Sequence, residues 1–435
     1  MTHSIADMRA VARRAFDALL ASAAARRFLP RHLPPPPAKG RIILLAGGKA
    51  AASMVEAAEE HYLDTLGFPV DRLGGIAVTC YSHGRRTRKV PVIQAGFPRP
   101  DLFGVAATER MLALADAAGA DDIVIVLLSA GAEANLVAPV RGLMLNEKQL
   151  LADQLLRAGA TQAECLSALR PLSAIKSGRL ALRAAPAEVV TITLPDRNGL
   201  SPKNVGGTPS LASTEKLGDC LDIVQRYRIA PAPSLNALFH DPANELPQAD
   251  AEVFRRGRAL VGLDPAEALA AAARTLEGEG YSVRNLGTAT LADARQAAFS
   301  HAALALEAKS SRQKVAILSG GLLTSATGPT GDTSPNQQFA LVLASTLGSM
   351  PGIVAMAAGT DGTDGGVGQP TDACGALIDP GTLERLRKQG MDADRLLNDN
   401  KASLAFRASG DSIVTGPTCT HAHDVRLILV DPALH

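Results

Sequence analysis

The stretch Gly352-Ile353-Val354-Ala355-Met356-Ala357-Ala358-Gly359-Thr360-Asp361-Gly362-Thr363-Asp364-Gly365 carries the pattern on which the fold prediction rests. Its first half is an apolar run typical of a buried strand, and its second half is rich in glycine, hydroxyl and carboxylate groups. In open α/β sheets, ligands bind at the carboxyl ends of the strands, where such loops lie. Carboxylates there can hold Mg²⁺ for a phosphate, but glycine and aspartate also form ordinary solvated turns. The composition of the loop leaves both interpretations open.

A second strand followed by a glycine turn lies near the start of the chain. An apolar run after Arg41 predicts a buried strand at 41–46, Gly47-Gly48-Lys49 predicts a tight turn, and residues 50–62 predict a helix. Glycine amides and a helix N-terminus together attract anions, and Lys49 adds a positive charge. The turn is not a Walker loop, because the pattern G-x-x-x-x-G-K-[ST] is absent. An anion site and a structural turn therefore both fit.

Strands and helices alternate along the rest of the chain. The first part predicts strands at 75–79, 122–129 and 189–194 and helices at 104–118, 145–158 and 161–182. Such alternation of apolar strands with helices indicates an α/β fold whose parallel sheet is covered on both faces. After a region rich in proline and asparagine at 231–250, the pattern predicts helices at 263–279, 291–309 and 336–347 and strands at 314–318, 352–357, 412–415 and 425–430. This region is the candidate domain boundary.

The overall composition excludes several classes of protein. The 435 residues carry a net charge of +1, contain no tryptophan and are 3% aromatic, so neither a nucleic-acid surface nor a basic membrane face is indicated. No apolar run approaches the roughly 20 residues of a membrane-spanning helix, and the first residues do not resemble a secretory signal. The five cysteines are odd in number and far apart, which predicts free thiols. We expect a cytoplasmic protein, monomeric or homodimeric, without nucleic-acid or membrane partners.

Several strings of residues resemble the bacterial and archaeal glycerate 2-kinases. The C-terminal part of that family is called the MOFRL domain, and its members also carry the name hydroxypyruvate reductase. The similarity runs almost from end to end, and its two most specific strings are the loop at 357–364 and Gly410-Asp411-Ser412-Ile413-Val414-Thr415-Gly416-Pro417-Thr418. Further matching strings are Gly48-Lys49-Ala50-Ala51, Gln94-Ala95-Gly96, Ser173-Ala174-Ile175-Lys176-Ser177-Gly178-Arg179-Leu180, Ser319-Gly320-Gly321, Asn336-Gln337-Gln338-Phe339-Ala340 and residues 370–375.

The resemblance implies a fold and a reaction. It implies a larger Rossmann-like parallel-sheet domain at 1–245 and a smaller α/β domain of MOFRL type at 250–435, with the active-site cleft between them. It also implies ATP-dependent phosphorylation of D-glycerate or a similar small hydroxy acid, on the 2-hydroxyl of glycerate, with ATP and Mg²⁺ as cofactors. Such chemistry consists mostly of positioning and charge neutralisation.

The matching motifs imply a set of site residues. The two lysines, Lys49 and Lys176, are expected to be catalytic. The expected ATP-binding residues are Gly47, Gly48, Ser129, Gly131, Ser319, Gly320, Gly321, Asn336 and Thr360. The substrate is expected to contact Arg179, Thr415 and Thr418. The acidic loop supplies the expected metal ligands Asp361, Asp364 and Asp372.

The chain departs from the family pattern at several of these places. A glycine-rich S-G-G-G-S loop of the family is here Ser129-Ala130-Gly131-Ala132-Glu133, which adds a carboxylate expected to repel phosphate. The places of two family arginines are taken by Asp332 and Pro335. Of the family's acidic loop S-D-V-P-G-D-D, at most Asp196 remains. Four residues, Gly366-Val367-Gly368-Gln369, are inserted in the other acidic loop, after residues 357–364. Loss of one transition-state arginine lowers a kinase rate by about three to five decades. The alternative function is therefore a catalytically altered or inactive relative that binds a small ligand.

Two further patterns bear on other reactions. His421-Ala422-His423-Asp424 places both imidazoles on one face of an extended segment, so with Asp361 or Asp372 they could bind a transition metal. The same residues could equally make ordinary hydrogen bonds, and a metal-dependent enzyme of another class is kept as an alternative. No G-x-G-x-x-G fingerprint follows any predicted strand, which argues against a nicotinamide-dependent reductase.

Overall fold

The computed structural model describes residues 4–194, 201, 205–325 and 334–434. Contacts between Cα atoms divide the chain into two compact units. We call Phe28–Gly262 the central unit, and Met1–Arg27 together with Leu263–His435 the terminal unit. This division differs from the predicted one, because the boundary lies after residue 262 and the N-terminal helix belongs to the second unit. The reason is that α1 (Ile5–Ser22) buries its apolar side against α12 (Pro265–Gly278) and β10 (Ile353–Gly359).

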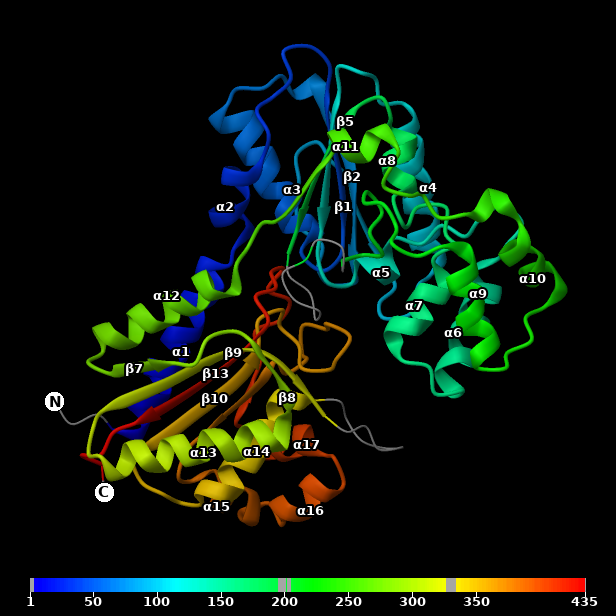
Figure 1. Cartoon of the computed structure of the whole chain (residues 1–435). Coiled ribbons are helices and arrows are strands. Elements are labelled where there is room, and N and C mark those ends of the chain that lie inside the picture. The colour runs from blue at the N-terminus through cyan, green and yellow to red at the C-terminus, as the bar shows by residue number, and fades with distance from the viewer. Residues whose placement is uncertain (1–3, 195–200, 202–204, 326–333, 435) are drawn as a thin grey trace. The chain divides into compact units, whose positions relative to one another are not determined.

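The central unit is built on a six-stranded parallel sheet, which confirms the predicted fold class (Figure 1). The strand order is β3-β2-β1-β4-β5-β6, the order typical of Rossmann folds. Helix α3 covers one face, and α4 and α8 cover the other. The strands are β1 (Ile42–Gly47), β2 (Leu73–Cys80), β3 (Val92–Ala95), β4 (Ile123–Leu128), β5 (Glu188–Thr193) and β6 (Arg258–Val261), and the covering helices are α3 (Ala51–Glu59), α4 (Leu102–Asp116) and α8 (Arg179–Ala184).

Four helices of the central unit form a separate cluster with its own small apolar core. They are α6 (Leu145–Arg157), α7 (Gln162–Leu169), α9 (Leu217–Arg226) and α10 (Pro233–His240), so the proline-rich region contains a packed helix. The single helix predicted at 161–182 is wrong. Pro171 and the positive φ angles of Ser177 (56°) and Gly178 (86°) interrupt it between α7 and α8. Among the described residues the unit also contains the short helices α5 (Ala132–Asn135) and α11 (Glu252–Arg256), a π-helical segment (Glu60–Thr65) and the 3₁₀ segments Leu29–His32, Val70–Arg72 and Pro242–Asn244. Helix α2 (Ala25–Phe28) lies at the boundary between the units.

The terminal unit contains a mixed sheet with the order β12-β11-β10-β13-β9-β7, and β8 also pairs with β9. Strand β13 is antiparallel to both β9 and β10, so the carboxyl ends of β9 and β10 lie beside the first residues of β13. The strands are β7 (Ser282–Asn285), β8 (Thr290–Asp293), β9 (Val315–Thr324), β10, β11 (Gly375–Ile378), β12 (Ser412–Ile413) and β13 (Asp424–Val430). Strand β9 continues beyond the predicted end at residue 318 and includes Ser319, Gly320 and Gly321.

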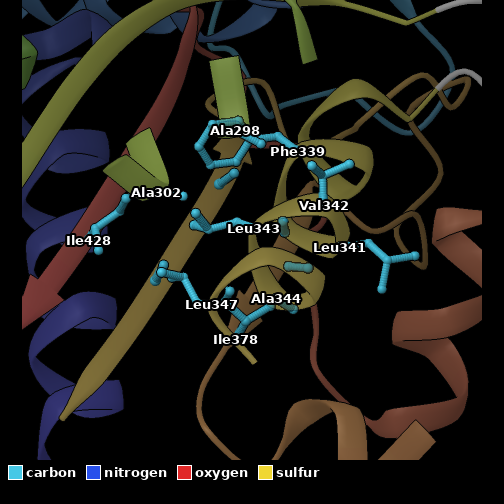
Figure 2. Close-up of a cluster of buried hydrophobic side chains, with 14 of the residues drawn as sticks. Ala298, Ala302, Phe339, Leu341, Val342, Leu343, Ala344, Leu347, Ile378 and Ile428 are labelled. Atoms are coloured by element: carbon cyan, nitrogen blue, oxygen red, sulfur yellow. The ribbon is translucent and has the colours of Figure 1, made fainter. Parts of the chain in front are cut away.

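Helices cover both faces of this second sheet. Helices α1 and α12 pack on one face, and α13 (Ala294–Ser310) and α14 (Pro335–Leu347) pack on the other. Figure 2 shows how α13 and α14 pack on the sheet: Phe339 and Leu343 of α14 lie near Ala298 and Ala302 of α13 and near Ile428 of β13. This aliphatic core agrees with the low aromatic content. The remaining helices are α15 (Thr382–Lys388), α16 (Ala393–Asn398) and α17 (Ala402–Ser409). No helix in the described ranges is long and apolar enough to cross a membrane.

Candidate functional site

The carboxyl ends of β1 and β4 lie side by side where the strand order of the central unit reverses. In doubly wound sheets this switch point is where ligands bind. Gly47 ends β1, and Gly48 and Lys49 form the turn that follows it. Ser129 and Gly131 lie in the loop after β4. The structure therefore brings together five residues that the motifs had singled out in two separate segments.

The turn after β1 is held tightly against the loop after β4. Gly48 has a φ of 106°, and a Cβ atom there would lie 2.4 Å from the carbonyl oxygen of Ser129, so only glycine fits. The amide of Lys49 donates to Ala130 O at 2.8 Å, and the amide of Ala50 donates to Ser129 Oγ at 2.9 Å. These two N–H groups therefore join the loops, and the expected role of this turn as a phosphate cradle stays a prediction.

The side chain of Lys49 is buried at this switch point. It is 5% exposed, and its ammonium lies 4.8 Å from the ring centroid of Phe97. An aromatic face attracts a cation, more strongly when water is excluded. Gly131 has a φ of 91°, and a Cβ atom there would lie 3.4 Å from Lys49 Cγ and 3.1 Å from Cys80 Sγ. Glycine at position 131 therefore leaves room for the lysine side chain, whose buried positive charge lies beside an aromatic ring.

Lys176 contacts the loop after β4 through the residue that departs from the family pattern. Its ammonium donates to the carboxylate of Glu133 and, at 2.8 Å, to the carbonyl oxygen of the same residue. Lys148 of α6 is buried nearby, and its pKa is lowered to about 7, first by burial and then by the charge of Lys176. Sequence reasoning missed Lys148, because a lysine in an amphipathic helix is ordinarily exposed.

Arg179 occupies a structural position in the central unit. Its guanidinium donates to the carbonyl oxygens of Pro171 at 2.9 Å and Asn244 at 2.7 Å, and also to that of Ser173. Burial lowers its pKa. The planar fork thereby joins the segment before α8 to the segment that follows α10. These bonds favour a structural tie over the expected contact with substrate.

A buried polar network lies in the terminal unit beneath the carboxyl end of β9. Ser319 Oγ is 2.9 Å from both Arg426 Nε and His301 Nε2. His301 Nδ1 lies 2.8 Å from the carbonyl oxygen of Ala297 and must donate to it, so Nε2 of the neutral ring accepts from the Ser319 hydroxyl, which in turn accepts from Arg426 Nε. Burial lowers the pKa of His301 and lowers that of Arg426 to about 10. Ser319 is thus a member of a packed network inside the sheet.

Gly320 and Gly321 lie in the same strand. Arg426 donates to the carbonyl oxygens of both, and the amide of Gly320 donates to Gly287 O at 2.7 Å. Their backbone groups are therefore engaged in the sheet. Their expected role in ATP binding stays a prediction.

The two most specific strings of the sequence lie against each other in the terminal unit. Thr418 Oγ1 donates to Thr360 O at 2.6 Å, and Thr360 Oγ1 donates to His423 O at the same distance. A Cβ atom on Gly362 would lie 2.1 Å from Gly416 O, which explains this glycine. Thr415 is half-buried and donates to the carbonyl oxygen of Gly416 at 2.8 Å. Thr360 and Thr418 therefore join neighbouring loops, whereas the bond from Thr415 is local, and the contact of Thr415 and Thr418 with substrate stays a prediction.

Asp364 caps the N-terminus of α14. Its two carboxylate oxygens accept the backbone amides of Asn336 at 3.0 Å and Gln337 at 2.8 Å, and both amide side chains as well. Ser334, at the cap position of the helix, makes no capping bond. Burial raises the pKa of Asp364 to about 7, although the donated hydrogen bonds oppose this shift. Asp364 thus acts as the N-terminal cap of α14, a role that the sequence did not indicate.

The carboxylates of the acidic loop do not converge on one point. Asp372 Oδ2 accepts the amides of Gly368 and Gln369, both at 2.9 Å, and Asp361 Oδ1 accepts the amide of Thr363 at 3.1 Å. Among the described residues, no three His, Cys, Asp or Glu side chains are placed to hold a metal ion. The expected three-carboxylate magnesium site therefore does not fit this arrangement.

His421 and His423 also do not belong to a group of metal ligands among the described residues. Their ring centroids are 5.7 Å apart, and the described part of the chain supplies no third ligand. The alternative of a transition-metal enzyme consequently has no support. Asp196 and Asp332 lie outside the described residues, whereas Pro335 is the first residue of α14.

A cavity of about 700 Å³ lies in the terminal unit beside the acidic loop. Ligand pockets in proteins span roughly 300 to 1,000 Å³, so this volume suits a nucleotide-sized molecule. Its wall includes the carboxylates of Asp364 and Asp372, one cation, Arg407, and the hydroxyls of Ser403 and Ser412. The inserted glycine Gly366 also borders it.

Comparisons with known proteins match nearly the whole chain to relatives that carry two names, glycerate kinase and putative hydroxypyruvate reductase. Residues 9–240 match a family described as a domain of unknown function (DUF4147), and residues 315–424 match the MOFRL family. A protein from Agrobacterium vitis named "Putative hydroxypyruvate reductase" is 36% identical over 436 residues, covering 99% of this chain and 96% of its own. The D-glycerate 2-kinase of Thermotoga maritima is 30% identical over 362 residues, covering 82% and 84%. A crystal structure of glycerate kinase from Thermotoga maritima superposes with a TM-score of 0.83 at 28% identity, covering 98% of this chain and 100% of that one.

Proposed function

Because this chain belongs to the glycerate 2-kinase family, in which a DUF4147 region precedes a MOFRL region, we propose that it transfers the γ-phosphoryl group of ATP to a small hydroxy acid. D-glycerate is the first candidate substrate, and its 2-hydroxyl is the candidate acceptor. The reductase name carried by two relatives from Agrobacterium vitis is less favoured, since no dinucleotide fingerprint follows the strands of this chain.

The buried ammonium of Lys49 is the observation that carries this proposal. It lies at the switch point of a parallel sheet, on a turn that only glycine can form. Phosphoryl transfer needs positive charge near the transferring oxygens, and such charge acts more strongly where water is excluded. Lys49 would therefore neutralise negative charge on the phosphoryl group or on the substrate carboxylate.

The cavity of the terminal unit is the candidate position for part of the nucleotide. Its volume is sufficient, and the hydroxyls of Ser403 and Ser412 can bond to a polar ligand. Its two carboxylates would repel phosphates unless a cation came with them. Since the acidic loop does not present a three-carboxylate metal site, we assign no step of the reaction to magnesium.

A steady-state assay of ADP formation tests the proposal. Purified protein with ATP, Mg²⁺ and D-glycerate should form ADP, and Lys49→Ala should lower the rate at least about 100-fold, as expected for loss of a preorganised charge. Lys49→Arg keeps the charge and serves as the matched variant. ADP formation no faster than that of Lys49→Ala would reject the kinase.

The catalytically inactive alternative gives a different result. Calorimetry would then detect binding of ATP or D-glycerate without turnover, and Pro335→Arg, which restores a family arginine beside the cavity, would raise the rate. Oxidation of NADH or NADPH by hydroxypyruvate in the same preparation would instead support the reductase name.

A further inference from the structure

Lys148 is a buried cation that the proposed reaction does not use. It is 6% exposed and lies on α6, in the helical cluster of the central unit. Its ammonium donates to Leu172 O at 3.5 Å, which is at the limit of a hydrogen bond. A lysine ammonium carries three N–H donors, and Lys148 forms no ion pair with any described residue. The site is therefore short of acceptors.

Lys148 shares its surroundings with the Lys176–Glu133 ion pair. The charge of Lys176 opposes protonation of Lys148 and that of Glu133 favours it, so the three groups are within electrostatic reach of one another. They come from three elements: α6, the segment before α8, and the short helix α5 after β4. Glu133 pairs with Lys176, and the charge of Arg179 also opposes protonation of Lys148, so cations outnumber carboxylates among these groups whenever Lys148 is protonated.

Two hydroxyl groups on the same segment as Lys176 also lack partners. Ser173 and Ser177 are fully buried, and within the described residues their Oγ atoms form no hydrogen bond. A buried hydroxyl without a partner carries a free-energy cost, so such groups indicate an absent ligand or water. An oxyanion could accept hydrogen bonds both from hydroxyls and from ammonium groups.

Glu133 is the most accessible member of the group. Its side chain is 26% exposed, whereas that of Lys176 is 7% exposed. We propose that Lys148 and Lys176 form a binding subsite for an oxyanion, and that the carboxylate of Glu133 is a built-in counter-ion that an incoming carboxylate or phosphate group displaces. The subsite goes beyond the proposed reaction, because anion binding needs neither ATP nor turnover.

Calorimetric titration of the full chain tests this subsite, first with inorganic phosphate alone and then with D-glycerate alone. Glu133→Gln removes the competing charge at almost constant volume, so it should tighten binding of at least one of the two anions by about tenfold. Lys148→Met should weaken binding of the same anion by about tenfold or more. Glu252→Gln, an exposed glutamate paired with Arg256 on α11, is the matched control and should bind like the parent.

The two titrations identify the ligand group and can overturn the proposal. A response with phosphate alone assigns a phosphoryl subsite, and one with D-glycerate alone assigns a carboxylate subsite. If the parent and Glu133→Gln bind each of the two anions with equal affinity, Glu133 is not a displaceable counter-ion and the proposal is refuted, even if ADP formation is observed. Circular dichroism of each variant verifies folding. If Lys148→Met fails to fold, Lys148→Gln replaces it, and the Glu133→Gln comparison remains decisive by itself.

Discussion

Replacement of Asp364 by alanine distinguishes a helix cap from a metal ligand. The carboxylate accepts four hydrogen bonds, two of them from backbone amides in the first turn of α14. Loss of a cap costs about 1 kcal/mol, and each stranded buried donor costs about 1 to 3 kcal/mol. Water can enter from the adjoining cavity and satisfy some donors, so we expect a loss of about 2 to 4 kcal/mol in the free energy of unfolding of the terminal unit.

The measurement is hydrogen exchange in EDTA, followed in peptides that cover α14, with urea denaturation as a second readout. Asp372→Ala is the control, since its carboxylate is half-buried and accepts only two loop amides, so it should cost less than about 1 kcal/mol. A metal ligand would show the opposite dependence, with no loss in EDTA and a loss only when Mg²⁺ is present. A change below about 0.5 kcal/mol for Asp364→Ala in EDTA would refute the cap.

Three further predictions concern buried charges and hydrogen bonds. The pKa of Lys148 is about 7 in the folded chain and near 10.5 when unfolded, so the unfolded state binds more protons between these values. The free energy of unfolding therefore rises with pH in this range, by up to about 1.4 kcal/mol per pH unit. The urea midpoint of the parent should increase relative to that of Lys148→Met between pH 7 and 9, and an unchanged difference between the two midpoints would contradict this. Ser319→Ala strands Arg426 Nε and should cost about 2 to 3 kcal/mol in thermal unfolding. The control is Ser345→Ala, a half-buried serine whose hydroxyl donates to Asp394 at the surface, and it should cost less than about 1 kcal/mol. Arg179→Lys cannot reproduce the fork and should cost about 2 to 4 kcal/mol; unchanged stability with a raised KM would show that Arg179 binds substrate instead.

Local patterns were sufficient for most elements of the fold. Apolar runs such as Ile42–Gly47 and Ile123–Leu128 form strands because each is long enough to cross a sheet and ends in a glycine or small-residue turn. The turn at Gly48 could be predicted because its positive φ excludes other residues. The helix predicted at 161–182 is wrong because the prediction followed the helical periodicity of the apolar residues. Pro171 and the positive φ angles of Ser177 and Gly178 end the helix inside this range.

Part of the candidate site also followed from the sequence. Lys49 lies where its motif predicted, at the end of a central strand, because parallel strands place their carboxyl ends on one edge of the sheet. The contact between the loop at 357–364 and the string at 410–418 was not predicted, although the glycine at Gly362 that permits it is visible in the sequence. These outcomes depend on short segments and on sheet geometry.

Only the tertiary structure decided which charged groups meet. Asp364 caps a helix that begins 29 positions earlier in the chain, Glu133 pairs with Lys176, and Lys148 is buried beside them. No local pattern contains these relations, because the energy of a carboxylate or ammonium depends on its burial and on partners from distant segments. The sequence by itself determined where strands, turns and the strings that resemble the family lie, whereas packing determined which of the expected ligands are already engaged by the protein.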